Sequence, residues 1–181
     1  MRRKNQNSEF IKLCLADALL DLMNRKEYVK ITVNEICERA GVGRSTFYRH
    51  FGSKAGKKDL IIYRLNWSYA KFCETTPYNG KNGDWNRRMI QFLDSEKNFL
   101  KQVVDNDLPF VFVEWLAGLV ENLPTGNESE YADYVKYFVA FNYFGAVYPW
   151  IKEGFKRTPE EIQQIVMKIL KEYLEDALAK Y

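Results

Sequence analysis

Residues 31–51 read ITVNEICERAGVGRSTFYRHF and contain the two short helices from which the fold can be worked out. Thr32 and Glu35 have the spacing of a capping box, so a helix is expected over residues 33–39. The sequence Ala-Gly-Val that follows allows a tight turn, because glycine tolerates a positive φ, before a second helix over residues 44–51. Two short helices joined in this way have the proportions of a helix-turn-helix.

The second of these helices has one apolar and one polar side, as a helix that enters the major groove of DNA must have. Phe47 and Phe51, four residues apart, supply the side that packs on the rest of the protein. The remaining positions are polar or basic, namely Arg44, Ser45, Thr46, Tyr48, Arg49 and His50. No acidic residue lies between Arg39 and Asp59, so nothing in this stretch of sequence repels phosphate.

The positive charge of the chain is concentrated in its first third. The 181 residues carry a formal charge of +3, yet residues 1–64 hold 14 Lys and Arg against 7 Asp and Glu, whereas residues 65–181 hold 13 against 17. This favours a polyanionic partner for the first third alone, or else a solvated basic face. The composition, 46% hydrophobic and 28% charged, excludes a disordered tail and a disulfide scaffold. No apolar run approaches the length of a membrane span, and we expect a cytoplasmic protein.

Helical periodicity runs through nearly the whole sequence, and strand-like alternation never exceeds a few residues, so we predict an all-α fold. A first helix is expected over about residues 8–23, ahead of the helix-turn-helix. Polar breaks at residues 75–84 and 122–127 separate further helices. A second capping box, formed by Thr158 and Glu161, opens the last helix.

Residues 31–51, with the helix expected before them, resemble the DNA-binding signature of TetR-family transcriptional regulators, and the resemblance covers about residues 8–65. It implies an all-helical homodimer whose N-terminal domain binds a double-stranded DNA operator. The C-terminal domain of such proteins dimerises and usually senses a small molecule. Residues 141–155 and 158–162 are similar to the C-terminal region of a Firmicutes-type branch, which includes the coactivator of a dihydroxyacetone kinase operon.

Taken position by position, the resemblance implies which side chains contact DNA. Thr46, Tyr48 and His50 are expected to face mainly the DNA backbone. Arg44 and Arg49 are expected to meet base edges, because a guanidinium can grip guanine O6 and N7 together. The full set assigned to DNA binding is Asn34, Gly43, Arg44, Ser45, Thr46, Tyr48, Arg49, His50, Lys54 and Lys57.

Two members of this set depend on the turn after the second helix. Lys54 matches the phosphate-binding lysine of the family, which is usually followed within three residues by a leucine of the next helix. Here Leu60 comes six residues after Lys54, as if three residues had been added. Counting back from Leu60 gives the lysine's place to Lys57, so both lysines stand as candidates.

Gly43 precedes the second helix of the motif, residues 44–51, which is the recognition helix of a helix-turn-helix. There it would bring a backbone amide and the positive end of the helix dipole to a phosphate.

The expected organisation is a three-helix helix-turn-helix domain, residues 1–57, followed by a helical C-terminal domain, residues 58–181. Aromatic residues at helical spacing in the second domain are most often ordinary core, but they can also line a ligand pocket between helices. The candidate effector pocket comprises Trp67, Phe92, Phe112, Trp115, Tyr137 and Phe141. The last two helices carry apolar stripes that suit a four-helix interface across the two-fold axis of a homodimer, unless they bury each other within one chain.

The sequence offers no arrangement of residues for catalysis or for metal binding. His50 is the one histidine and lies inside the DNA-binding motif, and the three cysteines share no metal-ligand spacing. We therefore expect neither enzymatic activity nor a cofactor. The sequence indicates a sequence-specific DNA-binding transcriptional regulator, a repressor released by a small-molecule effector. The alternative is a coactivator that keeps the helix-turn-helix fold and acts through another protein.

Overall fold

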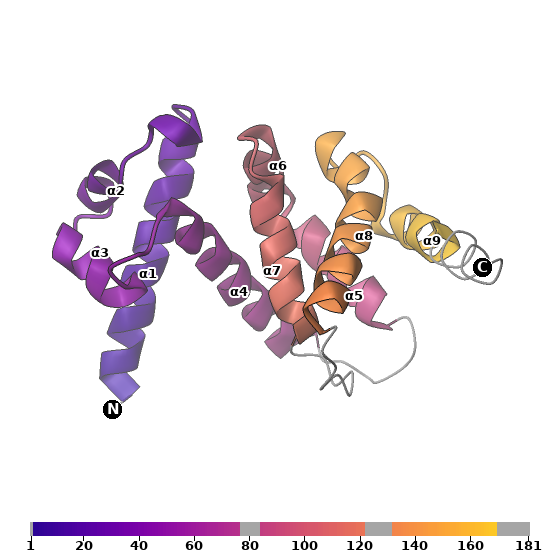
Figure 1. Cartoon of the computed structure of the whole chain (residues 1–181), viewed down its shortest axis with the longest axis horizontal. Helices are drawn as coiled ribbons and strands as arrows, with labels where there is room; N and C mark the ends of the chain where they lie inside the picture. Colours follow the sequence, from indigo (N-terminus) through magenta and orange to yellow (C-terminus); the bar gives the residue numbers. More distant parts are fainter. Residues whose placement is uncertain (1, 77–83, 122–131, 170–181) are drawn as a thin grey trace. The chain divides into compact units, whose positions relative to one another are not determined.

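The computed structural model describes residues 2–76, 84–121 and 132–169, and helices make up most of this part of the chain (Figure 1). No strand occurs within those three ranges, which confirms the all-α prediction. The chain divides into two compact units, residues 1–70 and 71–181. None of the helices in the described ranges is long and apolar enough to cross a membrane.

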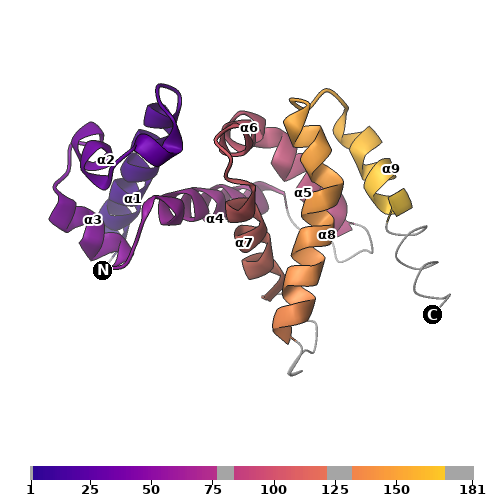
Figure 2. The same cartoon turned by 45° about the horizontal axis from the view of Figure 1, so that its top comes forward.

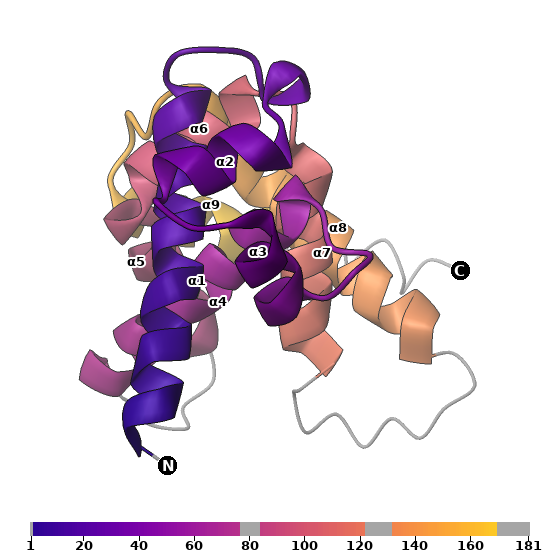
Figure 3. The same cartoon turned by 90° about the vertical axis from the view of Figure 1, so that its left-hand side faces the viewer.

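The first unit contains the helix-turn-helix and the helix that precedes it. Its elements are α1 (Arg2–Met23), the short 3-10 helix η1 (Tyr28–Lys30), α2 (Val33–Arg39), α3 (Arg44–Phe51) and α4 (Lys57–Thr75), which continues into the second unit. Figure 3 shows α2 and α3 lying against α1, and both helices contact it. The core of this unit is built from fully buried side chains that include Leu15, Leu19, Ile36, Phe47 and Leu60.

Local interactions fix both ends of α2. The hydroxyl of Thr32 accepts the backbone N–H of Glu35 at 3.2 Å, and the Glu35 carboxylate accepts the backbone N–H of Thr32 at 2.8 Å, so the predicted capping box is confirmed. Lys26 donates to the same carboxylate at 2.5 Å, and this contact, with the capping bonds, lowers the pKa of Glu35 to about 2. At the other end, Gly41 has a φ of 69°, the left-handed conformation that closes the turn to α3.

The second unit is a set of five helices in the described ranges. They are α5 (Asp84–Ser95), α6 (Lys97–Asp105), α7 (Pro109–Glu121), α8 (Ala132–Lys152) and α9 (Pro159–Ile169). α7 packs along α8, and α9 packs against both α5 and α8 (Figure 2). The core of this unit is aromatic and aliphatic, and its buried members include Phe92, Phe112, Trp115, Val147 and Trp150.

The predicted domain boundary and the predicted second capping box can each be set beside the elements of the structure. The predicted domain boundary at residue 57 coincides with the start of α4, whereas the first compact unit runs on to residue 70. The first half of α4 is tied to α1, because Arg64 pairs with Asp17 at 3.6 Å. The second capping box opens α9 as predicted, while the expected end of that helix and most of the two polar breaks lie outside the described residues.

Candidate nucleic-acid interface

The buried side of α3 is anchored by stacked aromatic rings. Phe47 is fully buried, and its ring stacks on that of Phe51 with 5.5 Å between centroids. Phe51 in turn meets Tyr63 of α4 edge to face at 5.7 Å. The ammonium of Lys12, on α1, lies 5.6 Å from the Phe51 ring and 5.2 Å from the Tyr63 ring. Rings from α3 and α4 and a cation from α1 therefore fix the orientation of α3.

The opposite side of α3 is polar and open to solvent. Its exposed or partly exposed side chains are Arg44, Ser45, Thr46, Tyr48 and Arg49. Neither α3 nor the turn after it contains a carboxylate before Asp59. This surface therefore offers guanidinium groups and hydroxyls, which donate hydrogen bonds to phosphate oxygens and to base edges.

The N-terminus of α3 belongs to the same polar surface. Gly43 is its N-cap, is exposed, and supplies no side chain to satisfy the amides of the first turn. The first turn contains no acidic residue, and Arg44 adds a positive charge to the positive end of the helix dipole. An anion such as a DNA phosphate is the complementary ligand for this helix end.

Asn34 lies on α2 and is exposed, with its amide already engaged. It donates to the carboxylate of Glu38 at 2.6 Å, so a contact with DNA requires the amide to exchange that partner. Arg39, at the end of the same helix, donates to Asp21 of α1 at 2.6 Å. This bond holds the end of α2 against α1, so Arg39 helps to position α2.

His50 is directed toward α1. Its Nδ1 lies 3.1 Å from the hydroxyl of Ser8, and its Nε2 is buried with no hydrogen-bond partner in the part of the chain that the structure describes. Burial, together with the nearby charges of Arg49 and Lys12, lowers the pKa of His50 below its ordinary value of 6.5. The lowered pKa favours the neutral ring at pH 7. The hydrogen bond between Ser8 and His50 joins the last turn of α3 to α1.

The two candidate lysines, Lys54 and Lys57, differ in their exposure and in their hydrogen bonds. Lys54 is exposed in the turn that follows Gly52, whose φ is 96°. Lys57 starts α4 and is half-buried, and its ammonium donates to backbone carbonyls of the segment before α2. Lys54 is therefore available to a phosphate, whereas Lys57 is engaged within the protein.

Three of the six residues expected to line an effector pocket form a packed aromatic cluster. Phe92, Phe112 and Trp115 are buried, with ring centroids 5.5 Å apart for Phe92 and Trp115 and 5.3 Å for Phe112 and Trp115. Their rings fill the interior of the second unit, which is the ordinary core that aromatic spacing most often indicates.

The other three members of that set are only partly buried or exposed. Trp67 belongs to the first unit and donates its indole N–H to Glu9 of α1 at 2.7 Å. Tyr137 and Phe141 lie on α8 and are exposed. Phe141 lines a shallow hollow with Asn142, Gly145, Ala146 and Ile169, between α8 and α9.

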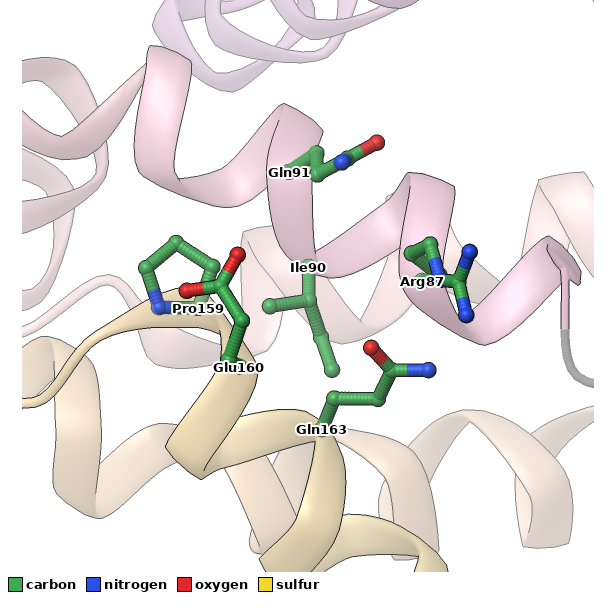
Figure 4. A pocket seen from close by; sticks show the side chains of 6 residues that line it. All are labelled: Arg87, Ile90, Gln91, Pro159, Glu160 and Gln163. Carbon is green, nitrogen blue, oxygen red and sulfur yellow. The ribbon is translucent and has the colours of Figure 1, made fainter.

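A pocket of about 320 Å³ lies between α5 and α9, at residues that the aromatic pattern does not single out. Figure 4 shows Arg87 and Glu160 at its opposite ends, with the buried side chain of Ile90 between them. The remaining lining residues are Gln91, Pro159 and Gln163. Arg87 and Gln91 are spaced i, i+4 on α5, and Glu160 and Gln163 are spaced i, i+3 on α9. These spacings place each pair on one face of its helix and could be read from the sequence. Only the packing of α5 on α9 brings the halves together.

The described residues contain no group of three or more His, Cys, Asp or Glu side chains that could hold a metal ion.

Comparison with known proteins is informative for both units. Residues 15–56 match the family described as bacterial regulatory proteins, tetR family, and residues 84–172 match one described as transcriptional regulator C-terminal region. YvkB of Bacillus subtilis, an uncharacterized HTH-type transcriptional regulator, is 24% identical over 155 residues, which cover 72% of this chain and 79% of that relative.

Proposed function

Because this chain belongs to the TetR family of transcriptional regulators, we propose that it represses transcription by binding an operator as a homodimer and is released by a small-molecule effector. DNA-binding regulation follows from the family. The observation that carries the proposed operator binding is the exposed side of α3. Cations, hydroxyls and an uncapped helix N-terminus gather there without a carboxylate. The proposed place of action is the cytoplasm, where a bacterial chromosome lies.

Each proposed DNA contact has its own chemistry. Arg44 and Arg49 read base edges, since a guanidinium can bond guanine at two acceptors. The hydroxyl side chains of α3, those of Ser45, Thr46 and Tyr48, donate to the DNA backbone. The Gly43 end of α3 receives a phosphate, and Lys54 neutralises another. Asn34 is retained as a contact at the edge of this surface, where Glu38 competes for its amide.

We propose that the dimer forms through α8 and α9. Large apolar side chains are exposed on these helices, including Tyr134, Tyr137, Phe138, Phe141, Ile165 and Met167. A surface of this kind, facing solvent in one chain, is typical of an interaction site. A two-fold axis through α8 and α9 would bury it in a four-helix interface and present two copies of α3 to a palindromic operator.

For the effector, the pocket between α5 and α9 has the more suitable lining. Among the described residues Arg87 and Glu160 form no ion pair, and the aliphatic side chain of Ile90 lies between them. This lining fits a small zwitterion whose two charges are separated by a carbon chain, such as an ω-amino acid. Since α9 contributes both to this pocket and to the proposed dimer surface, a ligand that favours one packing of α9 shifts the spacing of the two α3 helices. Operator affinity then changes by population shift.

The experiment that tests this function is a titration of the purified protein against fluorescent DNA from its own upstream intergenic region. Two salt concentrations and a scrambled competitor separate specific from electrostatic binding. Saturable, competitor-resistant binding is the expected result. Weak, salt-sensitive binding that ignores sequence would overturn the repressor proposal. It would favour the alternative, a coactivator that reaches the operator through another protein.

A further inference from the structure

The ammonium of Lys57 is bound by the segment that leads into the helix-turn-helix. Its Nζ donates to the carbonyl of Tyr28 at 2.5 Å and to that of Ile31 at 2.7 Å. The carbonyl of Val29 lies 3.5 Å away. The same ammonium sits 4.2 Å from the centroid of the Tyr28 ring. An ammonium has three N–H donors, so these acceptors leave it little capacity for a phosphate.

These contacts join two places that are distant in sequence and that flank the helix-turn-helix, one before α2 and the other after α3. Ile31 immediately precedes Thr32, the N-cap of α2, and Lys57 is the first residue of α4. On the other side of the same capping box, Lys26 holds Glu35 at 2.5 Å. The start of α2 is therefore held by one lysine from the turn after α1 and by another from the start of α4.

The position of Lys57 on its own helix makes these contacts more significant. A cation in the first turn of a helix is opposed by the helix dipole, so this place is unfavourable for a lysine without other partners. Gly56, before it, donates its backbone N–H to the carboxylate of Asp59 at 2.7 Å, which caps α4 without help from Lys57. The lysine side chain is thus free of any capping duty and extends instead to the carbonyls before α2.

We propose that Lys57 is a positioning residue for operator binding: it ties the start of α4 to the start of α2 and so sets the orientation of the helix-turn-helix, without touching DNA. The role rests on the proposed DNA-binding function. It also assigns a role to the lengthened turn after α3, since Lys57, at the end of that turn, reaches the carbonyls of both Tyr28 and Ile31. Lys54, which remains exposed, keeps the phosphate contact.

The test compares K57M, K57R and K58M with the wild-type chain in full length. K57M removes the donors and keeps an unbranched side chain, K57R keeps donors, and K58M removes the same charge from the adjacent exposed residue. Operator and scrambled DNA are titrated over a range of salt. Amide hydrogen exchange of residues 28–36 is measured without DNA.

For K57M we expect a loss of operator affinity of about tenfold, faster exchange over residues 28–36, and an unchanged salt slope. K57R should recover most of the affinity and protection, and K58M should leave the exchange of residues 28–36 as in the wild type. A salt slope lower by about 0.9 with unchanged exchange would make Lys57 a phosphate ligand and overturn the proposal. Wild-type affinity in K57M would overturn it as well. Absence of specific binding by the wild-type chain would instead refute the proposed function, and the two failures are thereby distinguished.

Discussion

The Nδ1 of His50 lies 3.1 Å from the Oγ of Ser8, so the last turn of the recognition helix is hydrogen-bonded to α1. The other ring nitrogen, Nε2, is buried without a partner in the described part of the chain. In the protonated ring both nitrogens carry an N–H, so the N–H at Nε2 has no acceptor among the described residues and the added charge lies near those of Arg49 and Lys12. The histidine that sequence reasoning assigns to DNA is thus held against α1 in the neutral form.

This arrangement makes stability depend on pH with a definite sign. The folded-state pKa of His50 is lowered, so the unfolded chain binds the proton more readily. The stabilisation by neutral His50 is complete above the unfolded-state value of 6.5 and is lost as the pH falls through the lower, folded-state pKa. Urea denaturation between about pH 7.5 and 5.5 should show a declining midpoint for the wild type and a flatter profile for H50Q. Equal pH profiles for the two proteins would contradict this account.

Arg44 and Lys54 should fail in different ways when removed. R44A should lower the ratio of operator to scrambled-DNA affinity by about tenfold or more, because a bidentate base contact contributes roughly 1–3 kcal/mol of discrimination. K54A should weaken binding to both DNAs alike and reduce the salt slope by about 0.9, as expected for one lost phosphate contact. Fluorescence anisotropy over a salt series measures both quantities. Small and equal effects from the two variants would remove the basis for the proposed division of roles.

The two capping boxes provide a matched pair of variants. T32A and T158A each remove an N-cap hydroxyl that accepts a backbone N–H at 3.2 Å. Each should cost about 1 kcal/mol of unfolding free energy and lower Tm by about 2–4 °C. Because T32A lies in the helix-turn-helix, it should weaken operator binding more than T158A does. A comparable loss of DNA affinity in T158A would show that the effect is general destabilisation.

Short-range features of this chain were predictable from sequence because their causes are local. Thr32 and Glu35 cap α2 through bonds across three residues, and Phe47 and Phe51 share the buried side of a helix by their spacing alone. The direction of the Lys57 side chain was not predictable in the same way. Its acceptors lie 26 and 29 residues earlier in the chain, and the tertiary fold decides that they meet.

The second unit shows the same limit at the level of packing. Periodicity correctly indicates that Phe92, Phe112 and Trp115 face inward, but it does not tell a filled interior from a hollow one. The pocket arises where α5 and α9 meet, and its polar lining resembles any solvated helix surface when α5 or α9 is read alone. Which helices pack together depends on contacts between distant segments. Periodicity within a single sequence does not predict this pairing.

The exposed apolar surface of α8 should be required for dimerisation. Phe138 is 58% exposed in the single chain, and F138E would place a charge in the proposed interface. Val29, 76% exposed on η1, provides the control, since V29E adds the same charge to an apolar position outside that surface. Sedimentation velocity at micromolar concentration should report a dimer for wild type and V29E and a monomer for F138E. A monomeric wild type would contradict the proposed dimer, and an F138E dimer would place the interface elsewhere.

The pocket between α5 and α9 should bind a ligand that carries both charges. Isothermal titration calorimetry with ω-amino acids, and with matched amines and carboxylic acids of the same carbon skeleton, tests the requirement for each charge. We expect at least one amino acid to bind, and we expect both its singly charged analogues and the variant R87Q to lose about tenfold in affinity. K156Q, which neutralises an exposed lysine outside the lining, is the control and should bind as the wild type does. If a ligand binds equally well to R87Q and the wild type, its site is not this pocket. If none of the panel binds, the pocket is a solvated groove and the effector has to be sought on another surface.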